Sequence, residues 1–264
     1  MYADDAVRRR AGSRRRRKRR GRRLAVLLAL CAACILAAWH WSGASADAPA
    51  DLRLYAAAHG TALREYPAQL IALYRRNPET RDYVFEYPQA HSERPEIDLR
   101  AEAGGGTVPL LMQWDQRWGY DAYAGDLFGL TGCGPTCLSM VALYRTGDAS
   151  LTPAYMRQFA TEHGYAAWNN GTEWALFSEG AAELGLSSQE LPLDRQRIVD
   201  HLETGGPVVC VVGPGDFTAT GHFLVLTGWE DGKFRINDPN SRENSERLWA
   251  YEEIQDQIRN LWAF

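Results

Sequence analysis

The chain has 264 residues, 45% of them hydrophobic and nine of them tryptophan. It is therefore long enough for one well-buried domain of roughly 150–200 residues, and its composition excludes a disordered protein. The formal net charge of −4 hides a polarised chain, because residues 8–23 hold 12 of the 29 basic residues. Beyond residue 23 there are 17 basic and 31 acidic residues, which argues against a nucleic-acid-binding face.

An apolar run of 18 residues, Leu24 to Trp41, follows the basic arm. Its length is at the lower limit for crossing a bilayer, and the flanking arginines orient the amino terminus toward the cytoplasm. We therefore expect a basic cytoplasmic arm (1–23) and a single-pass signal anchor (24–41) in the cell membrane, with the rest extracytoplasmic. One alternative is signal-peptidase cleavage after Ala46, which would secrete the protein.

Five cysteines do not form a disulfide framework. Cys31 and Cys34 lie in the apolar run, which leaves Cys133, Cys137 and Cys210 outside it. An odd number in an oxidising compartment leaves at least one free thiol. We expect Cys137 and Cys210 to be core residues.

The region 42–106 is predicted to be a linker and a helical preface. Apolar residues recur at helical spacing from Leu63 to Tyr74, and Asn77-Pro78 predicts a helix cap followed by the first helical residue. Residues 88–106 are polar and contain glycine and proline, as is typical of an exposed connection.

The main domain is predicted to occupy residues 107–264, with helices first and strands after them. Helical patterns cover 135–147, 153–163, 173–184 and 194–202, and a closing helix is expected over 251–260. Short β-branched or aromatic runs at 208–212, 222–228 and 233–237 are separated by turn sequences, which predicts an antiparallel sheet. This order indicates an α+β fold.

Three residues have the chemistry of a thiol nucleophile and its partners. Cys133 lies between two glycines just ahead of a predicted helix, where the positive helix end favours a thiolate. His222 starts an apolar strand and Asp238 follows the next one, so a base and an orienting carboxylate would lie at neighbouring strand ends. Taken singly, a buried structural cysteine, a core histidine and a turn aspartate are ordinary alternatives.

Metal and nucleotide sites have less support. The sequence contains no His-Glu-x-x-His motif and no pair of Cys-x-x-Cys motifs, and its glycines do not follow phosphate-loop spacing. We expect no cofactor and no metal.

The segments 108–140, Gly221-His222-Phe223 and 237–241 together resemble the bacteriocin-processing, or double-glycine-leader, peptidase-like family of papain-like cysteine peptidases. Within that family they resemble an extracytoplasmic bacterial branch. The resemblance implies a papain-like fold with the cysteine on a central helix and the histidine and aspartate on the sheet. It also implies Cys133 as nucleophile, His222 as base, Asp238 as orienter and Gln113 as the oxyanion residue.

The sequence departs from the family pattern at Gln113, which lies twenty residues before Cys133, whereas transporter-linked peptidases have only a few residues between them. The leading hypothesis is an extracytoplasmic cysteine peptidase or amide hydrolase whose partners are a peptide substrate and the membrane. Alternatives are an acyl transferase of the transglutaminase type and a binding module that has lost catalysis. The sequence leaves the natural substrate and the oligomeric state open.

Overall fold

A computed structural model of the chain describes residues 48–93 and 95–264. These fall into two compact units, one up to Ala68 and one from Gln69. In the first unit, helix α2 (Ala50–Ala58) precedes the 3-10 turn η1 (Leu63–Glu65). None of the helices in the described ranges is long and apolar enough to cross a membrane. The predicted span 24–41 and the cleavage site after Ala46 lie outside the described residues.

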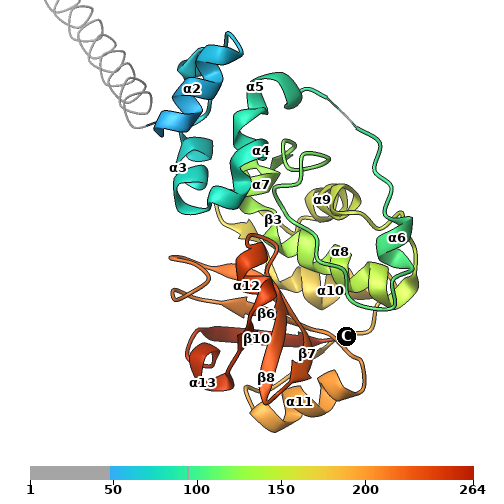
Figure 1. The fold of residues 1–264 in the computed structure, drawn as a ribbon. Coiled ribbons are helices and arrows are strands. Elements are labelled where there is room, and N and C mark those ends of the chain that lie inside the picture. Colours follow the sequence, from blue (N-terminus) through green and yellow to red (C-terminus); the bar gives the residue numbers. More distant parts are fainter. Residues whose placement is uncertain (1–47, 94) are drawn as a thin grey trace, which may run out of the picture. The chain divides into compact units, whose positions relative to one another are not determined.

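Most helices of the second unit lie in the first two thirds of its sequence (Figure 1). Its preface contains α3 (Ala68–Arg76, which begins at the unit boundary), η2 (Pro78–Thr80), α4 (Arg81–Phe85), α5 (Tyr87–Ala90) and α6 (Arg100–Ala103). The later helices are α7 (Phe128–Thr131), α8 (Cys133–Thr146), α9 (Pro153–Glu162), η3 (Trp174–Phe177), α10 (Glu179–Glu183), α11 (Arg195–Glu203), α12 (Arg242–Glu246) and α13 (Tyr251–Ile254).

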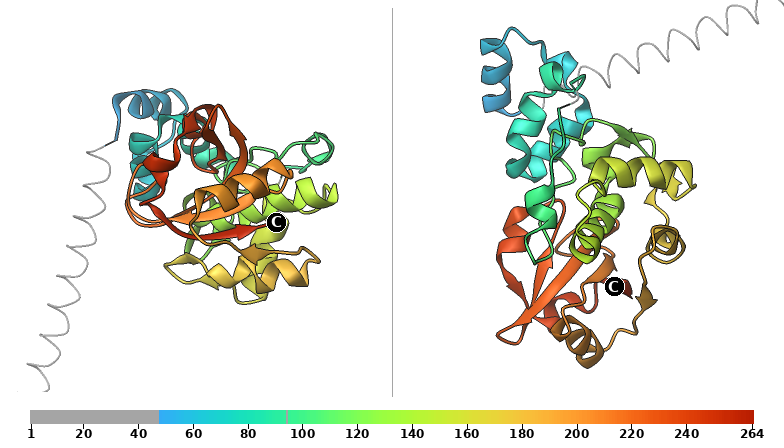
Figure 2. Two further views of the ribbon diagram at one scale, coloured as in Figure 1. Left: turned by 90° about the horizontal axis from the view of Figure 1, so that it is seen from below. Right: turned by 90° about the vertical axis from the view of Figure 1, so that its right-hand side faces the viewer.

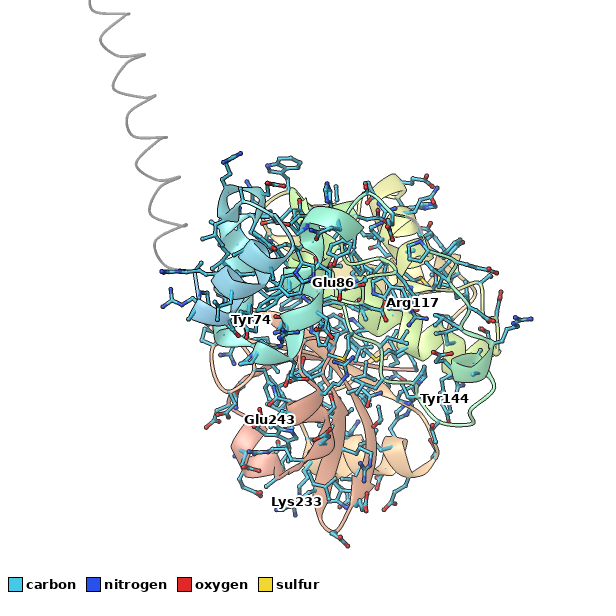
Figure 3. The ribbon with its side chains drawn as sticks, turned by 45° about the horizontal axis from the view of Figure 1, so that its top comes forward. Tyr74, Glu86, Arg117, Tyr144, Lys233 and Glu243 are labelled. Carbon is cyan, nitrogen blue, oxygen red and sulfur yellow. The ribbon has the colours of Figure 1, made fainter. Side chains whose placement is uncertain are left out.

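A six-stranded antiparallel sheet, in the order β5-β10-β6-β7-β8-β9, forms the other layer. Its strands are β5 (Gln189–Glu190), β6 (Val208–Val212), β7 (His222–Glu230), β8 (Lys233–Asn237), β9 (Leu248–Trp249) and β10 (Ile258–Ala263). Two small hairpins lie outside it: β1 (Ala122–Tyr123) with β2 (Asp126–Leu127), and β3 (Ala166–Ala167) with β4 (Gly171–Thr172). Strand β8 runs from Lys233, at the tip of the β7–β8 hairpin, toward the helical layer (Figure 3).

Both faces of the central strands are buried. In β6, Val209 and Val211 belong to the core shared with α8 and α9, whereas Val208, Cys210 and Val212 pack with α11. This alternation is the period of two that a strand imposes. The central strands are therefore packed against α8 and α9 on one face and against α11 on the other. Figure 2 shows the sheet and these helices from two further sides.

Much of this layout was predicted. Strands β6 and β8 have the expected limits, α8 ends at Gly147 with the left-handed φ of 69°, and Asn77 Oδ1 caps η2 by accepting from the Glu79 N–H at 3.1 Å. Cys137 and Cys210 are fully buried, and the described part of the chain has three free cysteines: Cys133, Cys137 and Cys210.

The helix expected over 251–260 was wrong, because only α13 is helical there and β10 begins at Ile258. A register irregularity between Ile258 and Asn260 lets Ile258 and Leu261 enter the same core, and that spacing of three imitates a helix. The helix expected over 173–184 is broken into η3 and α10 at Ser178.

Candidate active site

Cys133 is the first residue of α8, and close packing explains both glycines beside it. A Cβ added at Gly134 would lie 2.6 Å from Thr172 Oγ1, and one added at Gly132 would lie 2.6 Å from the Phe128 carbonyl oxygen. Because the neighbouring atoms belong to a short branched side chain and to backbone, neither position has room for a side chain. The glycines therefore bring the start of α8 against its neighbours and leave the Cys133 thiol half-buried.

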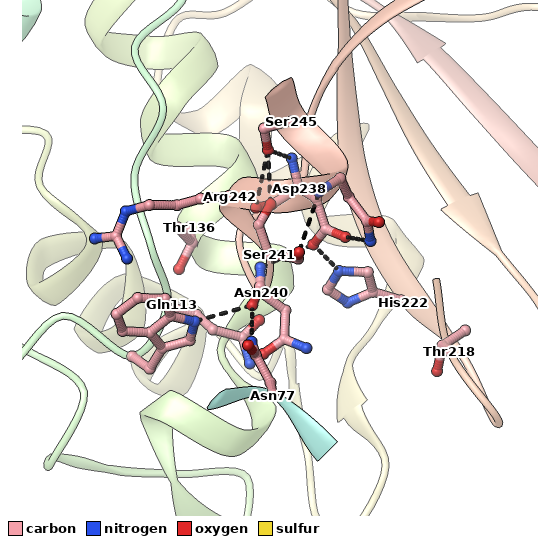
Figure 4. A network of polar contacts seen from close by, with 12 residues as sticks. Asn77, Gln113, Thr136, Thr218, His222, Asp238, Asn240, Ser241, Arg242 and Ser245 are labelled. Carbon is pink, nitrogen blue, oxygen red and sulfur yellow. Dashed lines mark hydrogen bonds and ion pairs between the residues drawn. The ribbon is translucent and has the colours of Figure 1, made fainter. Parts of the chain in front are cut away.

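His222 and Asp238 meet at the ends of adjacent strands. His222 opens β7 and Asp238 follows β8, and their side chains are joined by a 2.7 Å contact between Nε2 and Oδ1 (Figure 4). Only 7% of His222 and 1% of Asp238 is exposed. Since Asp238 occupies Nε2, Nδ1 is the ring nitrogen left for the Cys133 thiol, with which the imidazole forms a side-chain hydrogen bond.

The environment favours ionisation of this pair. Burial alone would raise the pKa of Cys133, but the hydrogen bond and positive charge of His222, with backbone N–H groups of Phe223 and Gly134, lower it. Burial alone would lower the pKa of His222, but the Asp238 carboxylate and the Cys133 sulfur outweigh it and raise this pKa. The arrangement therefore stabilises a thiolate beside an imidazolium.

The Asp238 carboxylate is fixed by its own turn. The Asn240 N–H donates to Oδ1 at 2.8 Å, and Asn244 Nδ2 donates to Oδ2 at 2.8 Å. The backbone N–H of Asp238 donates to Ser245 Oγ at 2.9 Å. Burial opposes ionisation of Asp238, but His222 and these donors lower its pKa, so it remains a carboxylate against the imidazole.

Two residues of the preface, which we call the Asn77–Glu79 clamp, hold the same turn from outside. Asn77 Nδ2 donates to the Asn240 carbonyl at 2.5 Å. The Glu79 carboxylate accepts from Ser241 Oγ at 2.9 Å and from the Arg242 N–H at 2.8 Å. These contacts join segments more than 160 residues apart in the sequence.

Gln113 lies behind this turn. Its backbone N–H donates to the Pro239 carbonyl at 2.8 Å, and its side-chain Nε2 donates to the Gly129 carbonyl at 3.0 Å. Its Oε1 is buried without a hydrogen-bond partner. The structure thus brings Gln113 close to the chain that precedes Cys133, with its amide donor engaged by Gly129.

A cavity of about 880 Å³ contains the thiol and the imidazole. One wall comes from the β1–β2 region and the β3–β4 hairpin with Trp174, and the other from the ends of β6 and β7 with Arg259. Gln113 is not among the described residues that line it. Of the titratable groups on its walls, Asp126 and Glu173 are acidic.

Sequence reasoning missed several residues that complete the site. Asn244, Ser245 and Glu79 were not singled out, Asn77 was predicted only as a helix cap, and Arg259 was placed in a helix. One signal was present for the first two: Ser241 Oγ accepts from the Asn244 N–H at 3.1 Å, a helix cap typical of serine. Within the described ranges, no three His, Cys, Asp or Glu side chains are placed to hold a metal ion.

Comparison with known proteins gives one family match. The model of the Peptidase_C39 like family matches residues 106–263. Among solved structures, the peptidase domain of Streptococcus ComA, a bi-functional ABC transporter involved in a quorum sensing pathway, is 24% identical with a TM-score of 0.40 and covers 51% of this chain and 90% of its own. A Bacillus anthracis protein described as a C39-like peptidase is 17% identical with a TM-score of 0.37 and covers 60% and 95%. No curated protein matches the chain.

Proposed function

The chain belongs to the Peptidase_C39 like family, and we propose that it is a cysteine peptidase or related amide hydrolase that works through Cys133, His222 and Asp238. The observation that carries this proposal is the imidazole held between the Asp238 carboxylate and the Cys133 thiol at a cavity wall. A nucleophile, a base and a group that orients the base are the parts that acyl transfer through a covalent intermediate needs.

In the proposed reaction, the Cys133 thiolate attacks the substrate carbonyl and forms a covalent acyl-enzyme. His222 Nδ1 holds the thiol proton and returns it to the leaving amine, and Asp238 keeps the ring oriented through Nε2. Water then attacks the thioester, with His222 as the base, and releases the acid. The sulfur leaves as a thiolate and His222 keeps the proton taken from water, which restores the starting ion pair.

The oxyanion of the tetrahedral intermediate needs preorganised donors. The Cys133 N–H lies in the first turn of α8, where backbone N–H groups have no intrahelical acceptor. Gln113 is proposed as the second donor. This role requires Nε2 to turn from the Gly129 carbonyl toward the cavity when substrate binds.

A thiol-alkylation assay tests the proposal without knowledge of the substrate. The rate at which iodoacetamide modifies Cys133 is measured against pH in the native and the urea-unfolded chain. The labelling of a Cys133→Ala variant is subtracted to remove the contribution of Cys31, Cys34 and the other cysteines. We expect faster native alkylation below pH 8. An equal rate in the folded and unfolded chain would contradict an activated nucleophile.

Product analysis then identifies the reaction. A peptide mixture is incubated with the full chain, with and without an added primary amine, and the products are identified by mass spectrometry. Free carboxyl termini that depend on Cys133 indicate hydrolysis, whereas amine-linked products indicate acyl transfer. No Cys133-dependent product despite an activated thiol would favour a binding module.

We also propose that residues 24–41 anchor the chain in the cell membrane with its catalytic domain outside the cytoplasm. The apolar run and the arginines before it support this orientation. Proteolysis of intact and opened bacterial cells tests it, because an outer domain is cleaved in both. Amino-terminal sequencing of the mature protein detects cleavage after Ala46.

A further inference from the structure

Arg259 lines the cavity that contains Cys133 and His222. It lies in the irregular part of β10, where pairing with β6 shifts register between Ile258 and Asn260. Irregularities of this kind redirect a side chain and occur often beside active sites. While Ile258 is buried in the core, Arg259 is exposed on the cavity wall.

The guanidinium of Arg259 is held in place by backbone. Its Nη1 donates to the carbonyls of Asp256 at 2.8 Å and Ile258 at 3.1 Å. A Cβ added at Gly213 would lie 2.7 Å from Nε and 2.8 Å from Nη2, so the guanidinium lies directly against this glycine. The charged group is therefore preorganised.

This charge has no acidic partner in the part of the chain that the structure describes. Arg247 and Arg235 both pair with glutamates, but no carboxylate forms an ion pair with Arg259. Asp126 and Glu173 line the same cavity without pairing with it. Its Nε and Nη2 likewise donate to no acceptor among the described residues. A fixed guanidinium with unused donors matches the geometry of a carboxylate.

The sheet register places this charge relative to the proposed catalytic residues. His222 pairs with Val212, and Val212 pairs with Ile258, so the residue before Arg259 is two strands from His222. Neighbouring strands are about 4.8 Å apart, which separates the two backbone positions by about 10 Å. An extended peptide covers that distance in about three residues.

We propose that Arg259 forms a carboxylate-binding subsite, which recognises a substrate carboxylate two or three residues from the bond that is attacked. This inference rests on the proposed function of Cys133. The carboxylate can belong to an aspartate or glutamate side chain or to a free carboxyl terminus. Both sources present the same two oxygens to the guanidinium.

Peptide vinyl sulfones that react with the catalytic thiol test the side-chain source in the full chain. Two matched sets carry Glu, Gln or Lys at the second or the third residue from the electrophile, and the second-order rate of Cys133 labelling is measured. We expect Glu to react at least about tenfold faster than Gln at one of these positions. Unreactive tripeptides with a free or an amidated carboxyl terminus test the other source by their protection of Cys133 from iodoacetamide.

Two substitutions assign the preference to the guanidinium. Arg259→Gln is expected to abolish the Glu preference or the carboxylate protection, and Arg259→Glu to shift the preference toward Lys. The matched control Arg197→Gln changes an exposed arginine on α11, away from the cavity, and is expected to retain the wild-type preference. Unchanged iodoacetamide rates would show that the variants keep the thiol site intact.

The outcomes separate this inference from the proposed function. A reactive Cys133 that shows neither the Glu preference nor the carboxylate protection would overturn the subsite alone. The same holds if the preference persists in Arg259→Gln. If Cys133 labels no faster than in the unfolded chain, the proposed function has failed and the subsite fails with it.

Discussion

The Asn77–Glu79 clamp joins the preface to the turn that carries Asp238, so we expect its removal to destabilise that turn. Replacing Glu79 with alanine removes a carboxylate that accepts from Ser241 Oγ at 2.9 Å and from the Arg242 N–H at 2.8 Å. Hydrogen bonds to a charged group contribute about 1.5–3 kcal/mol each when well formed. Because Glu79 is only half-buried, water reduces the contribution of these two hydrogen bonds. We therefore expect the free energy of unfolding to fall by about 2 kcal/mol.

Glu79→Ala should also lower the reactivity of the Cys133 thiol. Asp238 keeps its bonds to Asn244 and to the Asn240 N–H, but the turn loses one of its outer supports. If the full 2 kcal/mol were needed to hold the aligned geometry, the rate would fall by roughly 30-fold, which sets an upper limit. We therefore expect slower alkylation of Cys133 in Glu79→Ala at neutral pH, with a smaller effect in Glu79→Gln.

Urea unfolding and the pH dependence of Cys133 alkylation measure the two effects. Glu203→Ala is the matched control, because Glu203 is exposed at the end of α11. A structural effect alone would lower stability and leave the alkylation profile of the folded chain unchanged. If Glu79→Ala changes stability by less than about 0.5 kcal/mol and leaves alkylation as in the control, the clamp has no positioning role.

Three further predictions concern the site itself. The thiolate of Cys133 should form below the ordinary thiol pKa of about 8.5, and the imidazolium of His222 should persist until about pH 10, so the reactive ion pair should exist from the lowered pKa of Cys133 up to about pH 10. His222→Ala removes the hydrogen bond and the charge that contribute most to lowering the pKa of Cys133, while burial remains, so alkylation of Cys133 should shift to higher pH. Gly134→Ala should lower the free energy of unfolding by about 1–3 kcal/mol, measured in urea, because the new Cβ meets Thr172. Gln113→Ala should lower turnover by about 10²- to 10³-fold without slowing alkylation, if it serves the oxyanion.

Each of these has a result that contradicts it. An alkylation profile that does not move in His222→Ala would mean that the imidazole does not control the thiol. For the packing prediction, Gly221→Ala is the control, because its nearest contact would be the Val212 carbonyl oxygen at 3.9 Å. Equal stability of the two alanine variants would refute the close approach at Gly134. Slower alkylation in Gln113→Ala would mean that Gln113 helps to position Cys133 through its hydrogen bond to the Gly129 carbonyl.

Local patterns predicted the parts of the fold that local chemistry determines. Strand β6 is apolar on both faces and reads directly as a buried strand, and Gly147 ends α8 because it adopts a left-handed φ. Strand β10 could not be found in this way. Its Ile258 and Leu261 have helical spacing, and only pairing with β5 and β6 makes that segment extended.

The candidate site likewise has residues that the sequence predicts and residues that only the fold identifies. Cys133, His222 and Asp238 were identified because their residue types and order carry a chemical meaning, and the structure brings all three together. The groups that hold them are ordinary in sequence. Apart from the serine cap, neither an asparagine three residues after Ser241 nor a glutamate in the preface is distinctive in sequence, and the role of each depends on contacts that only the folded chain makes.

The clamp also bears on where the functional unit begins. The family model matches residues 106–263, which includes Cys133, His222 and Asp238 but not Asn77 or Glu79. Yet Tyr83 in the preface donates from its hydroxyl to the Gly119 carbonyl at 2.7 Å, and Tyr120 donates to the Tyr83 carbonyl at 2.8 Å. The preface thus contacts the chain ahead of Cys133 as well as the turn that follows β8. Because both halves of the proposed site rest on it, a unit that starts at residue 106 would lack supports on each side of the thiol and the imidazole.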